Sequence, residues 1–307
     1  MTTHQLEPGP DTTVQVFSRD LPAALTVEPG DTVRVRSLDA WGHLQRQAFP
    51  GEEQPQLFAD RKGHCLTGPI AVAGARPGDM LAVTFASLTP DSWGFTNAGR
   101  KDDAFTRLLA VEGGTPQWLL WEVDAGRGIA VNDLGQKVRL GPFLGVVGVP
   151  PAAHGEVTTT PPRADGGGNI DCRELTAGST LYLPVTVPDA LLCVGDGHAA
   201  QGDGEVGGTA IECGMTSELV LDLIPDPPLT SIHAVTPTSR ITFGFNADLN
   251  LATAEALKAM LTWMQSLFGM DRTRALALAS TVVDLRVTQI ANDTWGVHAV
   301  LKHDAVG

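Results

Sequence analysis

Acidic, imidazole and amide side chains are concentrated between residues 195 and 205, where the sequence reads Gly-Asp-Gly-His-Ala-Ala-Gln-Gly-Asp-Gly-Glu. The apolar residues just before this segment predict a strand. In an extended backbone Asp196 and His198 point to the same face, and so do Asp203 and Glu205. Several carboxylates so close together repel one another unless a cation lies among them, and carboxylate with imidazole suits zinc and similar divalent ions. We therefore expect a metal site here, against the alternative of a solvated acidic turn.

Glycines make the same segment conformationally permissive. Gly195, Gly197, Gly202 and Gly204 allow positive φ angles and let the backbone approach a ligand closely. Gln201 lies among them and adds an amide that can orient a bound group. Loops rich in Asp and Gly also bind calcium, although a histidine is foreign to an all-oxygen calcium site. Zinc is therefore the expected ion and calcium the alternative.

Two further segments carry polar residues of the same kinds. Asn169 and Asp171 follow three glycines at the end of the proline-rich connection 150–168. Connections this long within a compact domain are usually functional or disordered, and we expect this one to be functional. Glu212 interrupts the apolar run 209–213, so its side chain is either solvent-facing or buried beside a cation. We expect it to be buried.

The remaining histidines and the cysteines give weaker signals. His64 lies in a turn that leads into a strand and is placed to line a pocket. The four cysteines, Cys65, Cys172, Cys193 and Cys213, are scattered and form no Cys-x-x-Cys pair. We therefore expect neither a structural zinc site nor a disulfide framework, and each cysteine is predicted to be a small buried apolar residue.

Strands are the main elements that must position these residues. The chain contains 34 Gly and 21 Pro, and short Val/Ile/Leu/Thr runs recur between turn signals. Two Pro-Gly-Asp turns, at 28–31 and 76–79, fit type II geometry, and each leads into a strand. The runs that predict strands cover residues 12–17, 31–36, 80–86, 118–123, 129–131, 145–149, 179–187, 217–223 and 241–245. We predict a mainly β fold with β-sandwich or barrel portions.

The C-terminal part differs from the rest of the chain because its pattern predicts helices as well as strands. Apolar residues at helical spacing predict a helix from Thr253 to Phe268, with Thr253 as the N-cap and Gly269 at the C-terminal cap. A second helix is expected from Asp271 to Ser280, and strands are expected over 282–290 and 296–301. We therefore expect three parts: an N-terminal β domain, 1–145; a β domain with the candidate site, 146–250; and a smaller α+β segment packed on the β core, 251–307.

The composition limits the classes of partner. Acidic residues outnumber basic ones by 35 to 21, which gives a formal net charge of −14. Such a surface repels phosphate backbones and anionic lipid, so we expect no nucleic-acid and no membrane partner. The sequence shows neither an apolar run of bilayer-spanning length nor a secretory signal at its start. We therefore expect a cytoplasmic location.

Three motifs together resemble the acetamidase/formamidase family. They are Gly166-Gly-Gly-Asn-Ile-Asp171, the segment 195–205, and Gly208-Thr-Ala-Ile-Glu212. The likeness extends to residues 67–70, 78–79, 145–150, 175–185 and 284–289, so it covers nearly the whole chain. The chain departs from the family at Gly197, where a larger residue is usual, and at Ile170, which replaces a common Met. Both changes are expected to reshape the pocket, which puts the identity of the amide in question.

The resemblance implies hydrolysis of short linear amides, formamide or acetamide, to ammonia and the carboxylic acid. It also implies a cytosolic homo-oligomer, a dimer or larger, with a divalent metal near the active site. Combined with the spacing above, it leads to a hypothesis in which a metal-activated water attacks the amide. Our role assignments are as follows: Asp171, Asp196 and His198 hold the metal, Glu205 or Glu212 moves the proton, Asn169 and Gln201 orient the substrate, and His64, Asp203 and Gly197 line the pocket.

Three alternatives to this hypothesis remain. A related metal-dependent hydrolase would act on another small amide or a cyclic imide. A non-catalytic β-sandwich module would carry structural calcium and bind a ligand without releasing ammonia. A metal-dependent lyase would use the same cluster for elimination, and the masses of its products would distinguish it from a hydrolase.

Overall fold

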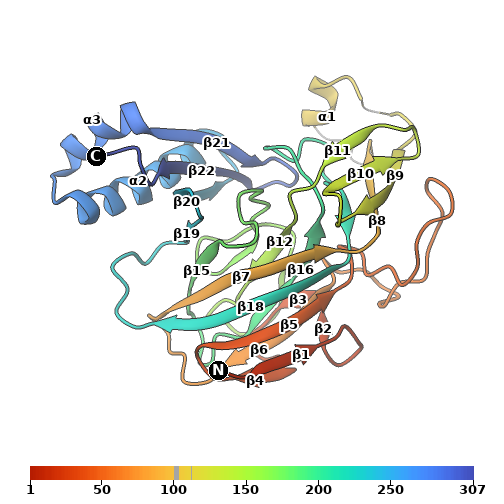
Figure 1. Cartoon of the computed structure of the whole chain (residues 1–307), viewed down its shortest axis with the longest axis horizontal. Coiled ribbons are helices and arrows are strands. Elements are labelled where there is room, and N and C mark those ends of the chain that lie inside the picture. The colour runs from red at the N-terminus through yellow and green to blue at the C-terminus, as the bar shows by residue number, and fades with distance from the viewer. Residues whose placement is uncertain (100–103, 112) are drawn as a thin grey trace.

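The computed structural model describes residues 1–99, 104–111 and 113–307, and two large open sheets dominate this part of the chain (Figure 1). The first has nine strands. Their spatial order is β1 (Thr3–Leu6), β5 (Asp31–Ser37), β18 (Met215–Ile224), β7 (Met80–Pro90), β15 (Thr180–Pro184), β19 (His233–Val235), β20 (Ser239–Asn246), β22 (Trp295–Lys302) and β21 (Val283–Gln289). All neighbouring strands in it are antiparallel except β1 and β5.

The second sheet carries most of the candidate site. Its main path is β11 (Lys137–Arg139), β10 (Ile129–Asn132), β9 (Gln117–Asp124), β8 (Trp93–Ala98), β17 (Glu212–Cys213), β16 (Leu192–His198), β12 (Phe143–Gly148) and β14 (Gly167–Asn169). The strand β6 (Leu66–Val72) pairs with β16 and carries β2 (Thr13–Val14) and β4 (Leu25–Val27). A separate pair joins β3 (Val16–Phe17) to β13 (Val157–Thr158).

The two sheets share one hydrophobic core. Val33 and Leu81 from the first sheet lie in the same buried cluster as Ile70, Leu144 and Val147 from the second. The prediction of a mainly β fold with a smaller C-terminal α+β part is confirmed, with sheets that remain open rather than closed into a barrel. The first sheet takes strands from all three segments proposed above, and the division at 145/146 and 250/251 stays a prediction.

The two Pro-Gly-Asp turns have the predicted geometry. Gly30 has a φ of 87° and Gly78 a φ of 105°. The Asp31 N–H donates to the Glu28 carbonyl at 3.0 Å, and the Asp79 N–H donates to the Arg76 carbonyl at 3.0 Å. Only a residue without a Cβ reaches such φ angles at no steric cost. The turns therefore fix where β5 and β7 begin.

The C-terminal helices pack on the end of the first sheet, at the left of Figure 1. Helix α2 (Leu249–Phe268) begins earlier than predicted because the Asp248 carboxylate accepts the N–H groups of Asn250 and Leu251. The predicted N-cap Thr253 is therefore wrong, and its hydroxyl donates to the Leu249 carbonyl inside the helix.

The other helix boundaries agree more closely with the sequence. Gly269 has a φ of 63° and ends α2 as predicted. Asp271 caps α3 (Arg272–Val282). The remaining short helix is α1 (Ala104–Leu108). Close packing of α2 on β20 requires a glycine at position 244, since a Cβ there would lie 2.0 Å from the Ala252 carbonyl oxygen.

One buried histidine makes this packing sensitive to pH. The ring of His233, on β19, stacks on Tyr182 at 4.5 Å between ring centroids and meets the edge of Trp263 at 5.0 Å. Its Nδ1–H donates to the Ser231 carbonyl at 2.8 Å. Burial lowers the pKa of His233 from 6.5 to about 4, because the charged imidazolium loses its hydration there.

We predict that His233 lowers stability on acidification. The unfolded chain binds a proton at this residue below its ordinary pKa of 6.5, whereas the folded chain does so only near 4. The free energy of unfolding should therefore fall by about 2 kcal/mol between pH 7 and pH 5 through His233 alone. Urea unfolding of wild type and His233→Phe at both pH values measures this, since phenylalanine keeps the stacking and does not titrate. An equal loss of stability in both proteins would contradict the assignment.

Candidate active site

Strand register brings the predicted site residues together. The strands β17, β16, β12 and β14 are neighbours in that order in the second sheet. His198 is paired with Glu212 across β16 and β17, and Asn169 is paired with Val146 across β14 and β12. The Asp171 N–H donates to the Gly145 carbonyl at 3.2 Å. Polar side chains that are far apart in the sequence therefore meet over the middle of the sheet.

The strand β16 extends further than the sequence indicates. Its apolar run suggests an end at Val194, but pairing with β12 and β17 continues the strand to His198. Asp196 and His198 are therefore held inside a buried strand rather than in a mobile loop. Their side chains lie close together, as predicted, with 3.5 Å between His198 Nε2 and Asp196 Oδ1, although Asp196 has a φ of 58° instead of the extended backbone that the prediction assumed.

His198 lies at the centre of the cluster. Its Nε2 atom is 3.4 Å from Glu212 Oε1. Potential ligand atoms of Asp171, His198 and Glu205 lie within 4.8 Å of one another, as do those of Asp196, His198 and Glu212. All five residues are buried, Glu205 being the most exposed at 7%. This is a dense group of four carboxylates and one imidazole, largely withdrawn from solvent.

Several buried polar atoms in and beside the cluster lack hydrogen-bond partners. They are Oδ1 and Oδ2 of Asp171, Nε2 of His198, Oε2 of Glu212 and Oδ1 of Asn169. Acceptor atoms buried in this way cost free energy unless a donor or a cation satisfies them. Carboxylate oxygens and an imidazole nitrogen form the ligand set that zinc prefers. The residues present therefore fit a divalent ion.

Gly145 has no side chain, and this leaves space between the potential ligands. A Cβ atom on Gly145, in β12, would lie 2.6 Å from Asp196 Oδ2, 2.7 Å from Asp171 Oδ1 and 2.9 Å from His198 Cε1. Its backbone φ lies outside the left-handed region, so a turn does not explain the glycine. Glycine is needed at this position because the polar groups converge directly over it. No feature of its local sequence marks Gly145 as a site residue.

Gln201 fixes the orientation of the central imidazole. Its Nε2 donates to the Asp171 carbonyl at 2.8 Å, which leaves its Oε1 to accept the Nδ1–H of His198 at 2.8 Å. The imidazole therefore directs Nε2 toward the carboxylates. A hydrogen-bonded second nitrogen of this kind is typical of histidines that bind metals. In this arrangement Gln201 acts through His198 and Asp171, outside the residues that line the cavity.

The carboxylates stabilise positive charge at the centre of the cluster. Burial disfavours the charged form of His198, but Glu212 and Asp196 outweigh it and raise the pKa of His198 well above its usual range. Burial and the neighbouring Glu205 raise the pKa of Asp171. Burial also raises the pKa of Glu205 to about 8 and that of Glu212 to about 7, despite the opposing effect of His198. A proton on His198 and a cation compete for the same negatively charged space.

Asp196 is the exception among these acids. Burial opposes its ionisation, but the two imidazoles of His64 and His198 outweigh burial and lower the pKa of Asp196. His64 Nε2 lies 4.0 Å from Asp196 Oδ2. Asp196 is therefore the carboxylate in this cluster that is most firmly ionised.

A cavity of about 300 Å³ opens onto the cluster. Five of the predicted residues line it: His64, Asn169, Asp196, Glu205 and Glu212. Thr160 adds part of the wall, and the Thr159 hydroxyl accepts the backbone N–H of His64 at 2.7 Å. The connection 150–168 therefore contributes Thr160 to the cavity wall, and the functional role expected for it stays a prediction.

Some lining residues carry no signal in the sequence, and two predicted pocket residues lie elsewhere. Trp41, Arg61 and Asn292 line the cavity from distant parts of the chain. Asp203 is exposed and does not share a face with buried Glu205, because the chain turns at Gly204 (φ 98°) and at Glu205 itself (φ 44°). A Cβ on Gly197 would meet the Cys213 carbonyl oxygen at 2.7 Å, so this position faces a neighbouring strand rather than the cavity.

The chain matches the acetamidase/formamidase family over residues 3–156 and 151–300. It is 28% identical over 280 residues to a formamidase of Methylophilus methylotrophus, an alignment that covers 72% of this chain and 68% of that protein. The crystal structure of an acetamidase from Bacillus halodurans is similar with a TM-score of 0.86 and 26% identity, covering 97% of both chains. An acetamidase from Yersinia enterocolitica has a TM-score of 0.88 and 25% identity, covering 99% of this chain and 93% of that one.

We predict that Gly145→Ala abolishes tight ion binding. The added methyl group would occupy the space between Asp171 and Asp196, so zinc affinity should fall at least tenfold. Isothermal titration calorimetry measures this in proteins that also carry His298→Gln, which weakens the separate ligand group of Cys172, Glu174 and His298. Gly141→Ala is the matched control, since a Cβ at Gly141 meets nothing within 4 Å. Both variants should keep the far-ultraviolet circular dichroism of wild type. Unchanged zinc affinity in Gly145→Ala would place the ion elsewhere.

Proposed function

The chain belongs to the acetamidase/formamidase family and is a hydrolase of amide C–N bonds, and we propose that its substrates are short linear amides such as formamide and acetamide. The products would be ammonia and the carboxylic acid. The observation that supports this most directly is the buried convergence of Asp171, Asp196, His198 and Glu212 beneath one cavity. The cavity, of about 300 Å³, readily accommodates amides of this size.

Amide hydrolysis makes three chemical demands. The water must be activated, the negative charge that develops on the carbonyl oxygen must be stabilised, and the leaving nitrogen must receive a proton. A divalent ion, zinc in the first instance and calcium as the alternative, would polarise the carbonyl and lower the pKa of water. Asp171, Asp196 and His198 are the residues that we propose hold it. Their unpartnered or closely spaced ligand atoms support this assignment.

The other polar groups of the cavity supply positioning and proton transfer. The Oδ1 atom of Asn169 is buried without a partner and lines the cavity, so it can accept an N–H of the substrate amide. Glu212 Oε1 accepts the Ala210 N–H at 2.9 Å, which leaves Oε2 free to take up or deliver a proton. Glu205 also lines the cavity and is the second candidate for this role. We assign the proton transfer to Glu212 or Glu205 and the orientation of the substrate to Asn169.

The roles of two other residues follow from their contacts. His64 reaches the cavity at the ionised Asp196, so we propose that it helps to hold that carboxylate in place. Gln201 orients His198 rather than the substrate, because both ends of its amide are used within the protein.

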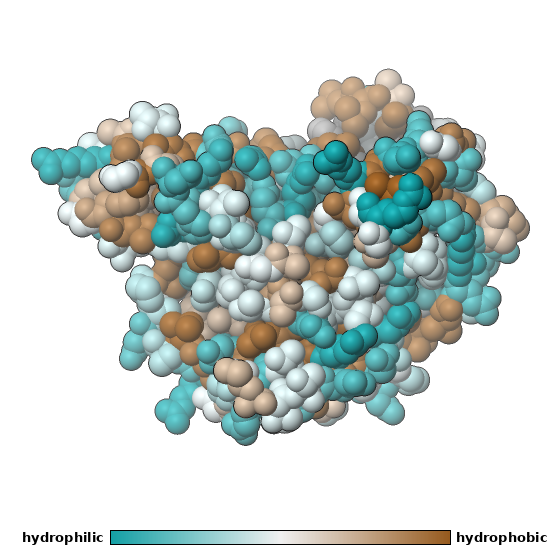
Figure 2. All heavy atoms as spheres, viewed as in Figure 1, coloured by the Kyte–Doolittle hydropathy of each residue, from teal (hydrophilic) through white to brown (hydrophobic). Residues whose placement is uncertain are grey.

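We also propose that the protein forms a homo-oligomer in the cytoplasm. Figure 2 shows hydrophobic side chains gathered over α2 and α3. The exposed residues of these two helices include Leu251, Leu267 and Leu276, and burial of such apolar side chains in a subunit contact would support an oligomer. Among the described residues, no helix is long and apolar enough to cross a membrane.

We predict that ammonia release depends on the ion and on His198. Purified protein should release ammonia from formamide and acetamide, lose this activity after chelation and regain it with zinc. His198→Ala should lower kcat/KM at least 100-fold, because it removes the central nitrogen ligand. His154→Ala is the matched control, since His154 is exposed and contacts only Asp20 among the described contacts. Full activity in His198→Ala, or in thoroughly chelated protein, would overturn the proposed mechanism.

A further inference from the structure

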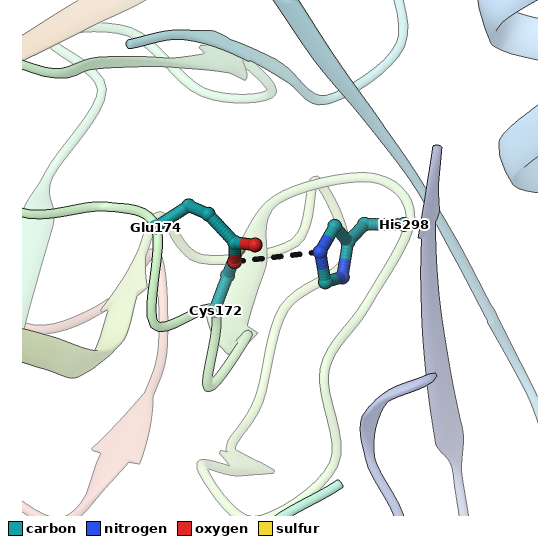
Figure 3. A group of neighbouring side chains, drawn as sticks. All are labelled: Cys172, Glu174 and His298. Atoms are coloured by element: carbon teal, nitrogen blue, oxygen red, sulfur yellow. Dashed lines mark hydrogen bonds and ion pairs between the residues drawn. The ribbon is translucent and has the colours of Figure 1, made fainter. Parts of the chain in front are cut away.

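A second group of potential ligands lies directly beyond Asp171 in the sequence. Cys172 and Glu174 follow β14, and His298 faces them from β22 (Figure 3). Glu174 Oε2 is 3.4 Å from Cys172 Sγ and 3.4 Å from His298 Nε2. The three ligand atoms all lie within 4.8 Å of one another. A thiol, a carboxylate and an imidazole thus converge from segments far apart in the sequence.

The spacing matches a small tetrahedral metal site. With bond lengths of about 2.3 Å for Zn–S and about 2.0 Å for Zn–N and Zn–O, neighbouring ligands of a tetrahedral ion are about 3.3–3.5 Å apart. Two of the three ligand pairs already have this separation. The third pair, Cys172 Sγ and His298 Nε2, lies within 4.8 Å.

His298 provides an independent sign of a ligand. Its side chain is fully buried, and its Nε2 has no hydrogen-bond partner although it faces Glu174. Its Nδ1 is hydrogen-bonded to the Thr288 hydroxyl at 2.8 Å. This is the same arrangement as His198 with Gln201, in which one ring nitrogen is anchored and the other is directed at a carboxylate.

The charges in this second group favour a divalent ion. Arg286 occupies Oε1 of the Glu174 carboxylate, which leaves Oε2 to face Cys172 and His298. A zinc-type ion displaces the proton of a coordinating thiol, and that proton would pass to solvent. The thiolate and the carboxylate would then give the ion two negatively charged ligands, beside the positive charge of Arg286.

Access to this group is separate from the active-site cavity. Glu174 lines a second cavity, of about 460 Å³, together with Arg173, Asp203 and Arg286. None of the residues that line this cavity also lines the active-site cavity. Water from this side can complete a fourth coordination position, as in zinc sites that have three protein ligands.

We propose that Cys172, Glu174 and His298 form a second, thiolate-containing site for a zinc-type divalent ion. The ion would join the segment that follows β14, which contains Asp171, to the C-terminal strand β22. Because none of these three ligands lines the active-site cavity, the ion would act apart from amide hydrolysis. This site is independent of the proposed function and does not require amidase activity.

Cobalt titration of the metal-free, full-length protein tests this site. Cobalt bound by a thiolate gives a sulfur-to-metal charge-transfer band in the near ultraviolet, whereas ligands of the first cluster contribute no thiolate. The band should grow with cobalt in wild type, disappear in Cys172→Ser, and require at least tenfold more cobalt in His298→Gln. The matched controls Cys193→Ser and Cys213→Ser change other free, buried cysteines and should keep the band.

Further measurements check that the variants fold and separate the second site from the active site. Circular dichroism checks that each variant folds, and His298→Gln carries the test if Cys172→Ser does not fold. His198→Gln should keep the band while losing ammonia release, which separates the two sites. The absence of a band from wild type at saturating cobalt, or its persistence in folded Cys172→Ser, would overturn the second site. Ammonia release without a band would leave the proposed function intact, whereas a band without ammonia release would reject only the proposed function.

Discussion

The repulsion among buried carboxylates around His198 is the constraint on which the site depends. Asp171, Asp196, Glu205 and Glu212 are withdrawn from solvent around one imidazole. Such an arrangement is costly unless positive charge is present among them, whether a proton or a cation. The raised pKa of His198 and the raised pKa values of Glu205 and Glu212 are two expressions of this excess of negative charge. A divalent ion relieves the repulsion most completely, because it satisfies the unpartnered oxygen atoms as well.

The fold holds these charges against their mutual repulsion. Backbone pairing of β16 with β12 and β17 fixes His198 opposite Glu212, and the hydrogen bond from Asp171 to Gly145 closes the other side. Neither contact depends on the charge of a side chain. The core shared by the two sheets keeps this register rigid, since slipping a strand by one residue would turn its polar side chains to the other face. Strand pairing and the shared core therefore supply the free energy that holds these charged residues together.

The sequence predicted the site residues better than their surroundings. Asp196 and His198 lie two residues apart, and their proximity was predicted from strand alternation, although Asp196 has a positive φ of 58°. Gly145 carries no comparable signal, because its importance arises only when β12 lies beside β16. Asp203 was misplaced because alternation was extended through a turn at Gly204. Local sequence patterns thus indicated which residue types could bind a metal. Pairing between distant strands determined which of these residues lie together at the site.

The same distinction applies to the rest of the fold. The Pro-Gly-Asp turns and Gly269 were predictable because each requires a positive φ angle at a known position. The start of α2 was misplaced because Asp248 and Thr253 are both acceptable caps, and packing of the helix on β20 selects the longer form. Cys172 and His298 are the clearest case in which the sequence does not indicate that two residues lie close together. Their separation in sequence gives no metal-binding pattern, yet the fold brings both to the same oxygen atom of one carboxylate.

Anomalous diffraction at the zinc edge, from crystals of the zinc-loaded protein, tests the central claim most directly. The account predicts a peak above Gly145, at about 2.0–2.2 Å from His198 Nε2 and from carboxylate oxygens of Asp171 and Asp196. An anomalous map without a peak among these residues, in crystals of protein that hydrolyses amides, would contradict it.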